Sequence, residues 1–141
     1  MDDIDLVILD GLREDARVTS AELGRRVKLS PKAVTDRIHR LEDTGVITGY
    51  HAGIDATKIG FPVRAYLHVK AARASYSQVI SLARDLPEVR EAHHVGEPKS
   101  FVLRVVARSQ EDLQRLSAAF EAFGPVKAAQ ILSTPVEKHT K

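Results

Sequence analysis

A block of positive charge between Gly24 and Arg40 is the strongest chemical signal in this sequence. It contains one acidic residue, Asp36, and six basic residues: Arg25, Arg26, Lys28, Lys32, Arg37 and Arg40. Residues 1–23 carry two basic and seven acidic residues, so the charge is unevenly distributed although the net charge is only +2. A local cationic block in a nearly neutral protein favours contact with an anionic partner such as DNA. A solvated helix face is the alternative.

The residues before this block predict a first helix, and the start of the block lies in a second one. The first helix has an acidic N-cap, Asp2 or Asp3, and apolar residues at helical spacing: Ile4, Val7, Ile8 and Leu12. The second helix follows Thr19, an N-cap residue that Glu22 accompanies three positions on in a capping-box pattern.

A third helix carries the rest of the block. Ser30 is an N-cap residue, Pro31 suits the first helical position because its missing N–H costs nothing there, and Gly45 ends the helix. One stripe is apolar: Val34, Ile38 and Leu41. The opposite side is polar, with Arg37 at its flank: Lys32, Thr35, Asp36, His39 and Arg40. Two short helices joined by a tight turn predict a helix-turn-helix, whose second helix enters the DNA major groove.

The polar face of the third helix indicates which residues would contact DNA. Base edges would be read by residues of its first turns: Lys32, Thr35, Asp36 and His39. The free N–H groups that follow Ser30 can meet a phosphate. Four arginines are expected on other phosphates: Arg25, Arg26, Arg37 and Arg40. Asp36 would repel DNA unless it accepts a hydrogen bond from a cytosine amine, and its alternative role is an ion pair with Arg40.

Five motifs occur in order within residues 2–60. They are D-x-x-D at the start, "DAR" before the second helix, "ELGRRVKLS", "V-x-x-R-I-x-R-L-E-x-x-G-V-I" and a final "GY". With these motifs the segment resembles the Lrp/AsnC (feast/famine) transcription regulators. The resemblance implies a headpiece that binds double-stranded DNA and a second domain that senses an amino acid or related metabolite. It also implies a homodimer that can assemble further to a tetramer or octamer.

The second half of the chain predicts a different domain. Four strands and two helices are expected in the order β-α-β-β-α-β: strands at 63–71, 89–95, 100–107 and 126–134, and helices at 75–86 and 109–123. Another short strand is expected at 48–54. This order predicts a ferredoxin-like sandwich with both helices on one face of the sheet, so the whole chain is α+β. Tyr66, Val102 and Val106 would lie on or near the other face, which a second copy would cover.

These patterns divide the chain into four parts. Residues 1–50 are expected to form a winged-helix-like helix-turn-helix domain, and residues 51–61, with two glycines, a linker. Residues 62–134 are expected to form the ferredoxin-like domain for effector binding and oligomerisation. Residues 135–141 are a polar tail.

The turn between the second and third strands of this domain departs from the family pattern. Family members often carry G-x-x-D there, where an amino-acid effector binds between subunits. This chain has Gly96-Glu97-Pro98-Lys99-Ser100, so Lys99 or Ser100 stands at the aspartate position. Lys99 would repel an ammonium group, whereas Glu97 could attract one. The candidate effector residues are Gly96, Glu97, Lys99 and Ser100, and an ordinary turn is the alternative.

The histidines do not predict a metal site or a catalytic centre. His93 and His94 are adjacent on an expected strand, so their rings point to opposite faces of the sheet. His68 would lie two strands away, at about 10 Å. The chain has no cysteine, which excludes thiolate chemistry. We therefore expect no enzyme, no metal and no cofactor.

Two other functions are alternatives to a regulator. Siroheme decarboxylases resemble this two-domain plan, but their local pattern includes asparagine and tryptophan, and this chain has neither. A DNA-organising protein without an effector would use the same headpiece residues. No apolar run approaches the roughly 20 residues that span a bilayer, and the acidic start does not match a signal peptide. A cytoplasmic protein without membrane contact is expected.

Overall fold

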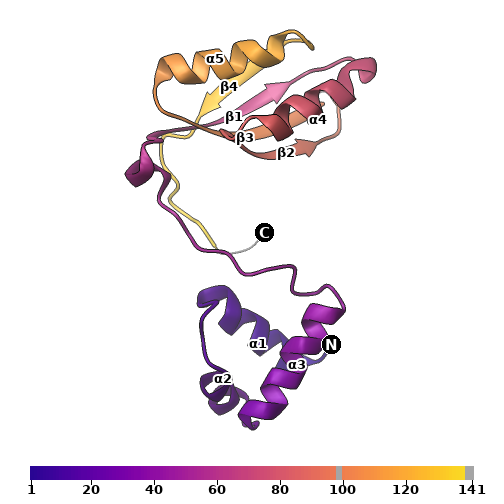
Figure 1. The fold of residues 1–141 in the computed structure, drawn as a ribbon, viewed down its shortest axis with the longest axis vertical. Helices are drawn as coiled ribbons and strands as arrows, with labels where there is room; N and C mark the ends of the chain where they lie inside the picture. Colours follow the sequence, from indigo (N-terminus) through magenta and orange to yellow (C-terminus); the bar gives the residue numbers. More distant parts are fainter. Residues whose placement is uncertain (98–99, 139–141) are drawn as a thin grey trace. The chain divides into compact units, whose positions relative to one another are not determined.

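The computed structural model describes residues 1–97 and 100–138. The chain divides into two compact units, one built from Met1–Gly53 together with residues 136–138 and the other from Ile54–Pro135. The first unit is helical, and the second is a sheet with α-helices on one face (Figure 1). The observed elements confirm the predicted fold class.

The N-terminal unit consists of helices α1 (Asp3–Glu14), α2 (Ser20–Val27) and α3 (Pro31–Asp43). All three predicted N-caps are present, because Asp2, Thr19 and Ser30 each accept a hydrogen bond from the backbone N–H three residues on. The second half of the predicted capping box in α2 is replaced by an ion pair, since the Glu22 carboxylate binds Arg25 (Nε to oxygen, 3.1 Å). These caps place the helix ends where the local sequence expects them.

A small apolar core holds the three helices together. Its fully buried members come from all three helices: Ile8, Leu23, Val34 and Leu41. Ile38 and other half-buried apolar side chains pack around them. The turn between α2 and α3 brings the Leu29 carbonyl oxygen close to Gly24. A Cβ at position 24 would lie only 2.4 Å from that oxygen, so only glycine fits there. The core fixes which side of α3 faces outward.

Residues 48–54 do not form the predicted strand. A strand needs a neighbour to bind its backbone N–H and C=O groups, and no described segment of this chain pairs with this stretch. The next ordered element is a short 3-10 helix, η1 (Ala56–Ile59), which the Asp55 side chain caps. The prediction was therefore wrong for the single chain.

The C-terminal unit has the predicted β-α-β-β-α-β order. Its elements are β1 (Val63–Val69), a 3-10 turn η2 (Arg73–Ser75), α4 (Tyr76–Asp85), β2 (Val89–His94), β3 (Phe101–Ala107), α5 (Gln110–Glu121) and β4 (Val126–Gln130). The sheet is antiparallel with strand order β2-β3-β1-β4, and α4 and α5 cover one face (Figure 1). This is the ferredoxin-like arrangement.

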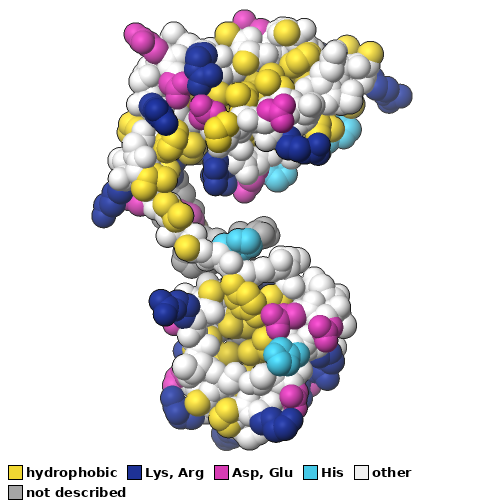
Figure 2. All heavy atoms as spheres, viewed as in Figure 1, with side chains coloured by type: hydrophobic (Ala, Val, Ile, Leu, Met, Phe, Trp, Pro, Cys, Tyr) yellow, Lys and Arg dark blue, Asp and Glu magenta, His cyan; other side chains and the backbone are white. Residues whose placement is uncertain are grey.

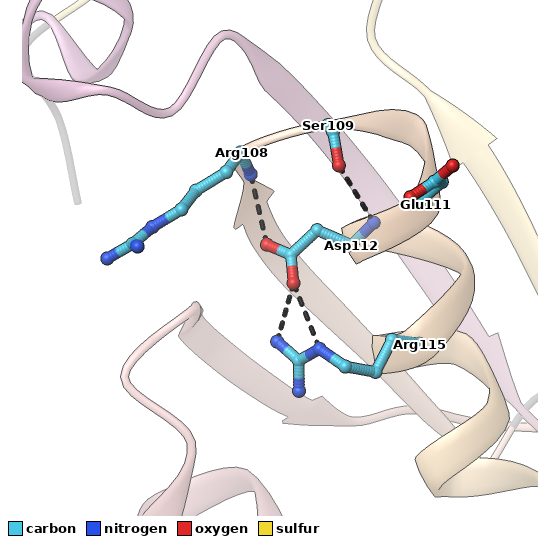
Figure 3. Close-up of a pocket in the computed structure, with 5 residues that line it drawn as sticks. All are labelled: Arg108, Ser109, Glu111, Asp112 and Arg115. Atoms are coloured by element: carbon cyan, nitrogen blue, oxygen red, sulfur yellow. Dashed lines mark hydrogen bonds and ion pairs between the residues drawn. The ribbon is translucent and has the colours of Figure 1, made fainter.

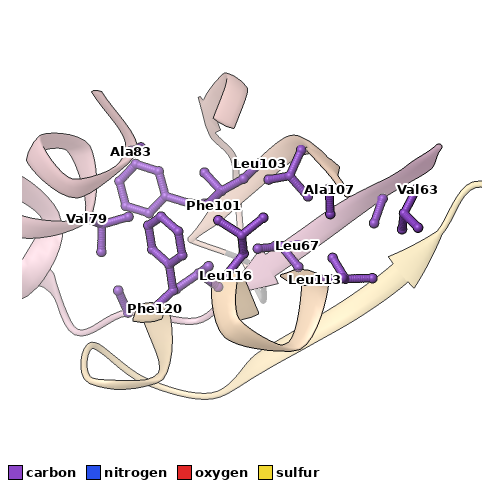
Figure 4. Packing of buried hydrophobic residues seen from close by; sticks show 14 residues of the cluster. Val63, Leu67, Val79, Ala83, Phe101, Leu103, Ala107, Leu113, Leu116 and Phe120 are labelled. Carbon is purple, nitrogen blue, oxygen red and sulfur yellow. The ribbon is translucent and has the colours of Figure 1, made fainter. Parts of the chain in front are cut away.

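Strand alternation builds the core of this unit. Every second side chain of β1 and β3 points toward the helices and is buried: Val63, Ala65, Leu67, Val69, Phe101, Leu103, Val105 and Ala107. Phe120 and Leu116 of α5, with Val79 of α4, pack against them (Figure 4). The predicted open face is confirmed for Tyr66, which is 39% exposed, whereas Val106 is only 8% exposed and offers little surface.

Candidate nucleic-acid interface and effector turn

The outward side of α3 presents a pair of opposite charges. The Lys32 ammonium lies 3.0 Å from a carboxylate oxygen of Asp36, one turn further along the helix, and these side chains are 86% and 62% exposed. The alternative that Asp36 pairs with Arg40 is wrong in this structure, because Arg40 instead reaches Asp5 of α1 at 3.5 Å. His39 is also exposed on α3. This side therefore offers both a hydrogen-bond donor and an acceptor.

One flank of α3 is held by an ionic cluster. Arg37 donates to both carboxylate oxygens of Asp2 (2.9 and 2.9 Å) and to Asp5 (3.0 Å). The Asp5 N–H and then Arg37 lower the pKa of Asp2, while hydrogen bonds to Asp2 and Asp5 raise the pKa of Arg37. The Asp5 side chain is only 2% exposed. Arg37 thus ties α3 to the first turn of α1, and this geometry does not favour the predicted phosphate contact.

The other flank of α3 is held by hydroxyl groups. The Thr35 and Ser20 hydroxyls lie 2.9 Å apart in a half-buried position between α3 and α2. Thr35 therefore faces α2 rather than the open side where base edges were expected. The Ser30 hydroxyl accepts from the Ala33 N–H at 3.2 Å, so it serves as the helix cap.

The remaining basic candidates lie on α2 and in the turn after it. Arg25 is bound to Glu22, and Arg26 lies 3.7 Å from both Glu14 and Glu22. Figure 2 shows basic and acidic side chains interspersed over the visible face of this unit, as these pairs require. Lys28, which the set of predicted contacts omits, is exposed at the C-cap of α2, three residues before the start of α3, and has a left-handed backbone (φ 59°). Its place in the basic block next to the Ser30 cap was the signal that could have identified it.

The candidate effector turn divides into exposed and buried residues. Gly96 and Glu97 are exposed, whereas Ser100 is 3% exposed and its hydroxyl donates to the Ala71 carbonyl at 3.0 Å. Ser100 therefore anchors the start of β3, which corrects its assignment as an effector ligand. Lys99 lies outside the described residues.

An aromatic cluster lies beside this turn, and sequence reasoning did not identify it. The His94 ring is 5.0 Å from the Tyr76 ring and 5.1 Å from the Phe101 ring, measured between centroids. Tyr76 and Phe101 are themselves in edge contact at 5.2 Å. The three rings come from β2, α4 and β3, so only the fold brings them together.

The paired histidines separate as predicted. His93 lies 3.0 Å from Glu91, which also binds Arg104 at 3.2 Å, while His94 packs in the aromatic cluster. His93 and then Arg104 lower the pKa of Glu91. Within residues 1–97 and 100–138, no group of three or more histidine or acidic side chains could hold a metal ion. No helix in the described part of the chain is long and apolar enough to cross a membrane.

A shallow hollow of about 460 Å³ lies at the start of α5 (Figure 3). Its polar groups bind one another: Asp112 accepts from the Arg108 N–H (3.0 Å) and from Arg115 (3.0 Å), and its own N–H donates to Ser109 (3.1 Å). The Arg108 N–H and then Arg115 lower the pKa of Asp112. The side chains of Ser109, Asp112 and Arg115 therefore cap the start of α5 and satisfy one another's hydrogen bonds.

The geometry defines a class of protein: a helix-turn-helix headpiece joined to a ferredoxin-like domain. A family model described as "AsnC-type helix-turn-helix domain" matches residues 1–42, and one described as "Lrp/AsnC ligand binding domain" matches residues 64–139. The chain belongs to the Lrp/AsnC family of transcriptional regulators.

Individual relatives agree with this assignment. The HTH-type transcriptional regulator LrpC of Bacillus subtilis is 33% identical over 114 residues, which cover 81% of this chain and 79% of LrpC. YezC, an HTH-type transcriptional regulator from the same organism, is 35% identical over 134 residues, or 95% of each chain. The structure of LrpC superposes with a TM-score of 0.91 at 30% identity and covers 98% of this chain and 99% of that one.

One solved relative contains a small molecule. The feast or famine regulatory protein Rv3291c from M. tuberculosis, complexed with L-methionine, has a TM-score of 0.87 at 29% identity. The match covers 99% of this chain and 97% of that chain.

Proposed function

We propose that this protein binds double-stranded DNA with α3 in the major groove. The observation that carries the proposal is the two-sided character of α3. Val34 and Leu41 are buried, while Lys32, Asp36 and Arg40 on the opposite side are exposed. The first-turn N–H groups of α3 and the exposed cations Arg25 and Lys28 provide phosphate contacts next to that side.

The proposed assembly is a homodimer formed through the open face of the sheet. Tyr66 and Val102 lie on that face, which no helix of the described residues covers in this unit, and a second copy would cover them. A dimer presents two copies of α3 to major grooves about 34 Å apart on a pseudo-palindromic site. Further assembly to a tetramer or octamer is part of the same proposal.

The proposed effector is an amino acid or a related small metabolite at the turn before β3. Support comes from the exposed Gly96 and Glu97, because the Glu97 carboxylate can attract an ammonium group. The His94 and Tyr76 rings lie next to this turn and could contact an apolar side chain. The relative complexed with L-methionine supports the same class of ligand.

We further propose a cytoplasmic protein that acts by binding rather than by catalysis. Membership in a family of transcriptional regulators supports this proposal. The absence of asparagine and tryptophan argues against the siroheme-decarboxylase alternative, whose local pattern uses both.

The test is a fluorescence-anisotropy titration of the protein with the DNA upstream of its own gene, at about 150 mM salt and with random DNA as competitor. We expect binding that survives the competitor and changes when individual amino acids are added. Binding that the competitor abolishes would contradict sequence-specific regulation and support the DNA-organising alternative. Competitor-resistant binding that no amino acid alters would contradict only the effector part of the proposal.

A further inference from the structure

We propose that Asp36 determines base specificity by directing the Lys32–Asp36 pair to a G·C base pair. This inference rests on the proposed function, because it requires α3 to lie in a major groove. Lys32 would donate to guanine, and Asp36 would accept from the amine of the paired cytosine. Asp36 would disfavour base pairs that present an acceptor where cytosine has its amine, as thymine does with O4.

The structure fixes the direction in which this pair points. Thr35 on one flank is held to Ser20 of α2, and Arg37 on the other flank is held to Asp2 and Asp5 of α1. The inner side of α3 is buried in the core. With three sides of the helix fixed, rotation about its axis is restricted. Lys32 and Asp36 project from the remaining side, where they are 86% and 62% exposed.

The chemistry of the pair matches a G·C base pair. The ammonium group has three donors and no acceptor, whereas an ionised carboxylate only accepts. In the major groove a G·C pair presents the acceptors N7 and O6 of guanine beside the amine donor of cytosine. The two charges, 3.0 Å apart, offer the complementary donor and acceptor side by side. An A·T pair offers lysine no adjacent pair of acceptors, so the match there is poorer.

The pair also separates affinity from specificity. Its charges cancel, so it adds little to the attraction between the protein and phosphates in general. A carboxylate that meets the O4 acceptor of thymine in place of the cytosine amine is left unpaired near phosphates, and this lowers affinity for the wrong sequences. Removal of Asp36 should therefore tighten binding to random DNA while it weakens the preference for one base pair.

The experiment compares the wild type with Asp36→Ala and with the control Asp10→Ala. Asp10 is 69% exposed and pairs with Arg13 three residues on in α1, so the control removes the same charge and a similar surface ion pair. Both substitutions introduce the best helix former, and thermal melting would verify that each variant is folded. The full-length proteins would select sequences from a randomised DNA pool, and their binding to random DNA would be titrated against salt.

We expect the wild type to enrich a motif containing a G·C position at which Asp36→Ala loses about tenfold of the preference. The same variant should bind random DNA more tightly, with a salt slope steeper by about one, because Lys32 is freed for a phosphate. Asp10→Ala should retain the motif and the slope. Identical motifs and slopes for the wild type and Asp36→Ala would overturn this inference and leave the proposed function intact. A wild type that enriches no motif would overturn the sequence-specific part of the proposed function, and this inference with it.

Discussion

The two units of this chain are stabilised in different ways. Among the described residues, fourteen buried apolar residues form the core of the sheet unit, whereas four form the fully buried core of the headpiece. A core of four cannot supply much hydrophobic stabilisation, since each buried side chain contributes about 1.5–3 kcal/mol. The headpiece adds polar links between its helices, chiefly Arg37 with Asp2 and Asp5 and Ser20 with Thr35.

The two units also differ in which residues adopt a left-handed backbone. In the sheet unit, glycines occupy the left-handed positions, as at Gly60 and Gly124. In the headpiece Gly45 occupies one such position, but Lys28 occupies another, and it is the only non-glycine residue with a positive φ among the described residues. The comparison indicates that the sheet unit is built for stability, while the headpiece accepts ionic links and a strained residue beside its proposed DNA-binding side.

The largest expected effect is the loss of Phe120 from the sheet core. Phe120→Ala would leave a cavity under α5 and cost about 3–5 kcal/mol, because the side chain is fully buried. Hydrogen exchange followed by mass spectrometry would locate the change. Peptides from Ile54–Pro135 should lose protection while peptides from Met1–Gly53 keep it. Equal loss in both units would show that they fold as one.

A smaller effect, confined to the headpiece, is expected from Asp5→Ala. The substitution leaves Arg37 with Asp2 alone and removes the partner of Arg40, so we expect a cost of about 3 kcal/mol. Asp3→Ala is the control, because Asp3 has the same charge in the same first turn but is exposed. The same exchange measurement should show loss only in peptides from Met1–Gly53. If the two variants were equally stable, the ionic cluster would not be what holds α3 to α1.

The ionic links also predict a response to acid. The folded pKa of Asp2 is lowered, so its stabilising contribution is present above the ordinary carboxyl pKa of 3.8 and is lost as the pH falls through the lower folded value. Asp2→Asn keeps a good N-cap but cannot ionise. Headpiece stability should therefore fall less steeply between about pH 5 and 2 in Asp2→Asn than in the wild type. Parallel pH profiles from hydrogen exchange would exclude this contribution.

Local signals in the sequence predicted most of the fold. The caps Thr19 and Ser30, the spacing of Val34 and Leu41, and the alternation along β1 each depend on a few neighbouring residues. The strand predicted at residues 48–54 is absent because a strand depends on a partner, which a local sequence pattern does not specify.

The site was less predictable because its contacts join distant parts of the chain. Helical spacing correctly placed Arg37 at the flank of α3, but it could not show that Asp2, 35 residues away, lies opposite. For the same reason Thr35 was assigned to base edges although it faces Ser20, and Ser100 was assigned to an effector although it binds Ala71. A helix or strand pattern gives the direction of a side chain and not the identity of its neighbour.

The smallest expected effect on stability, and the sharpest contrast between the units, comes from Lys28→Gly. Glycine adopts the left-handed backbone without strain, which favours the variant by about 1 kcal/mol, although the loss of a cation at the end of α2 offsets part of this. We expect unchanged or slightly higher headpiece stability, measured by hydrogen exchange.

If Lys28 contacts a phosphate, the same variant should bind DNA more weakly, with a salt slope reduced by about one. Gly60→Ala is the matched reversal, since it places a side chain at a left-handed position of the sheet unit and should lower stability without altering the slope. A less stable Lys28→Gly with an unaltered slope would mean that the lysine supports the turn, and the functional explanation of its strained backbone would be wrong.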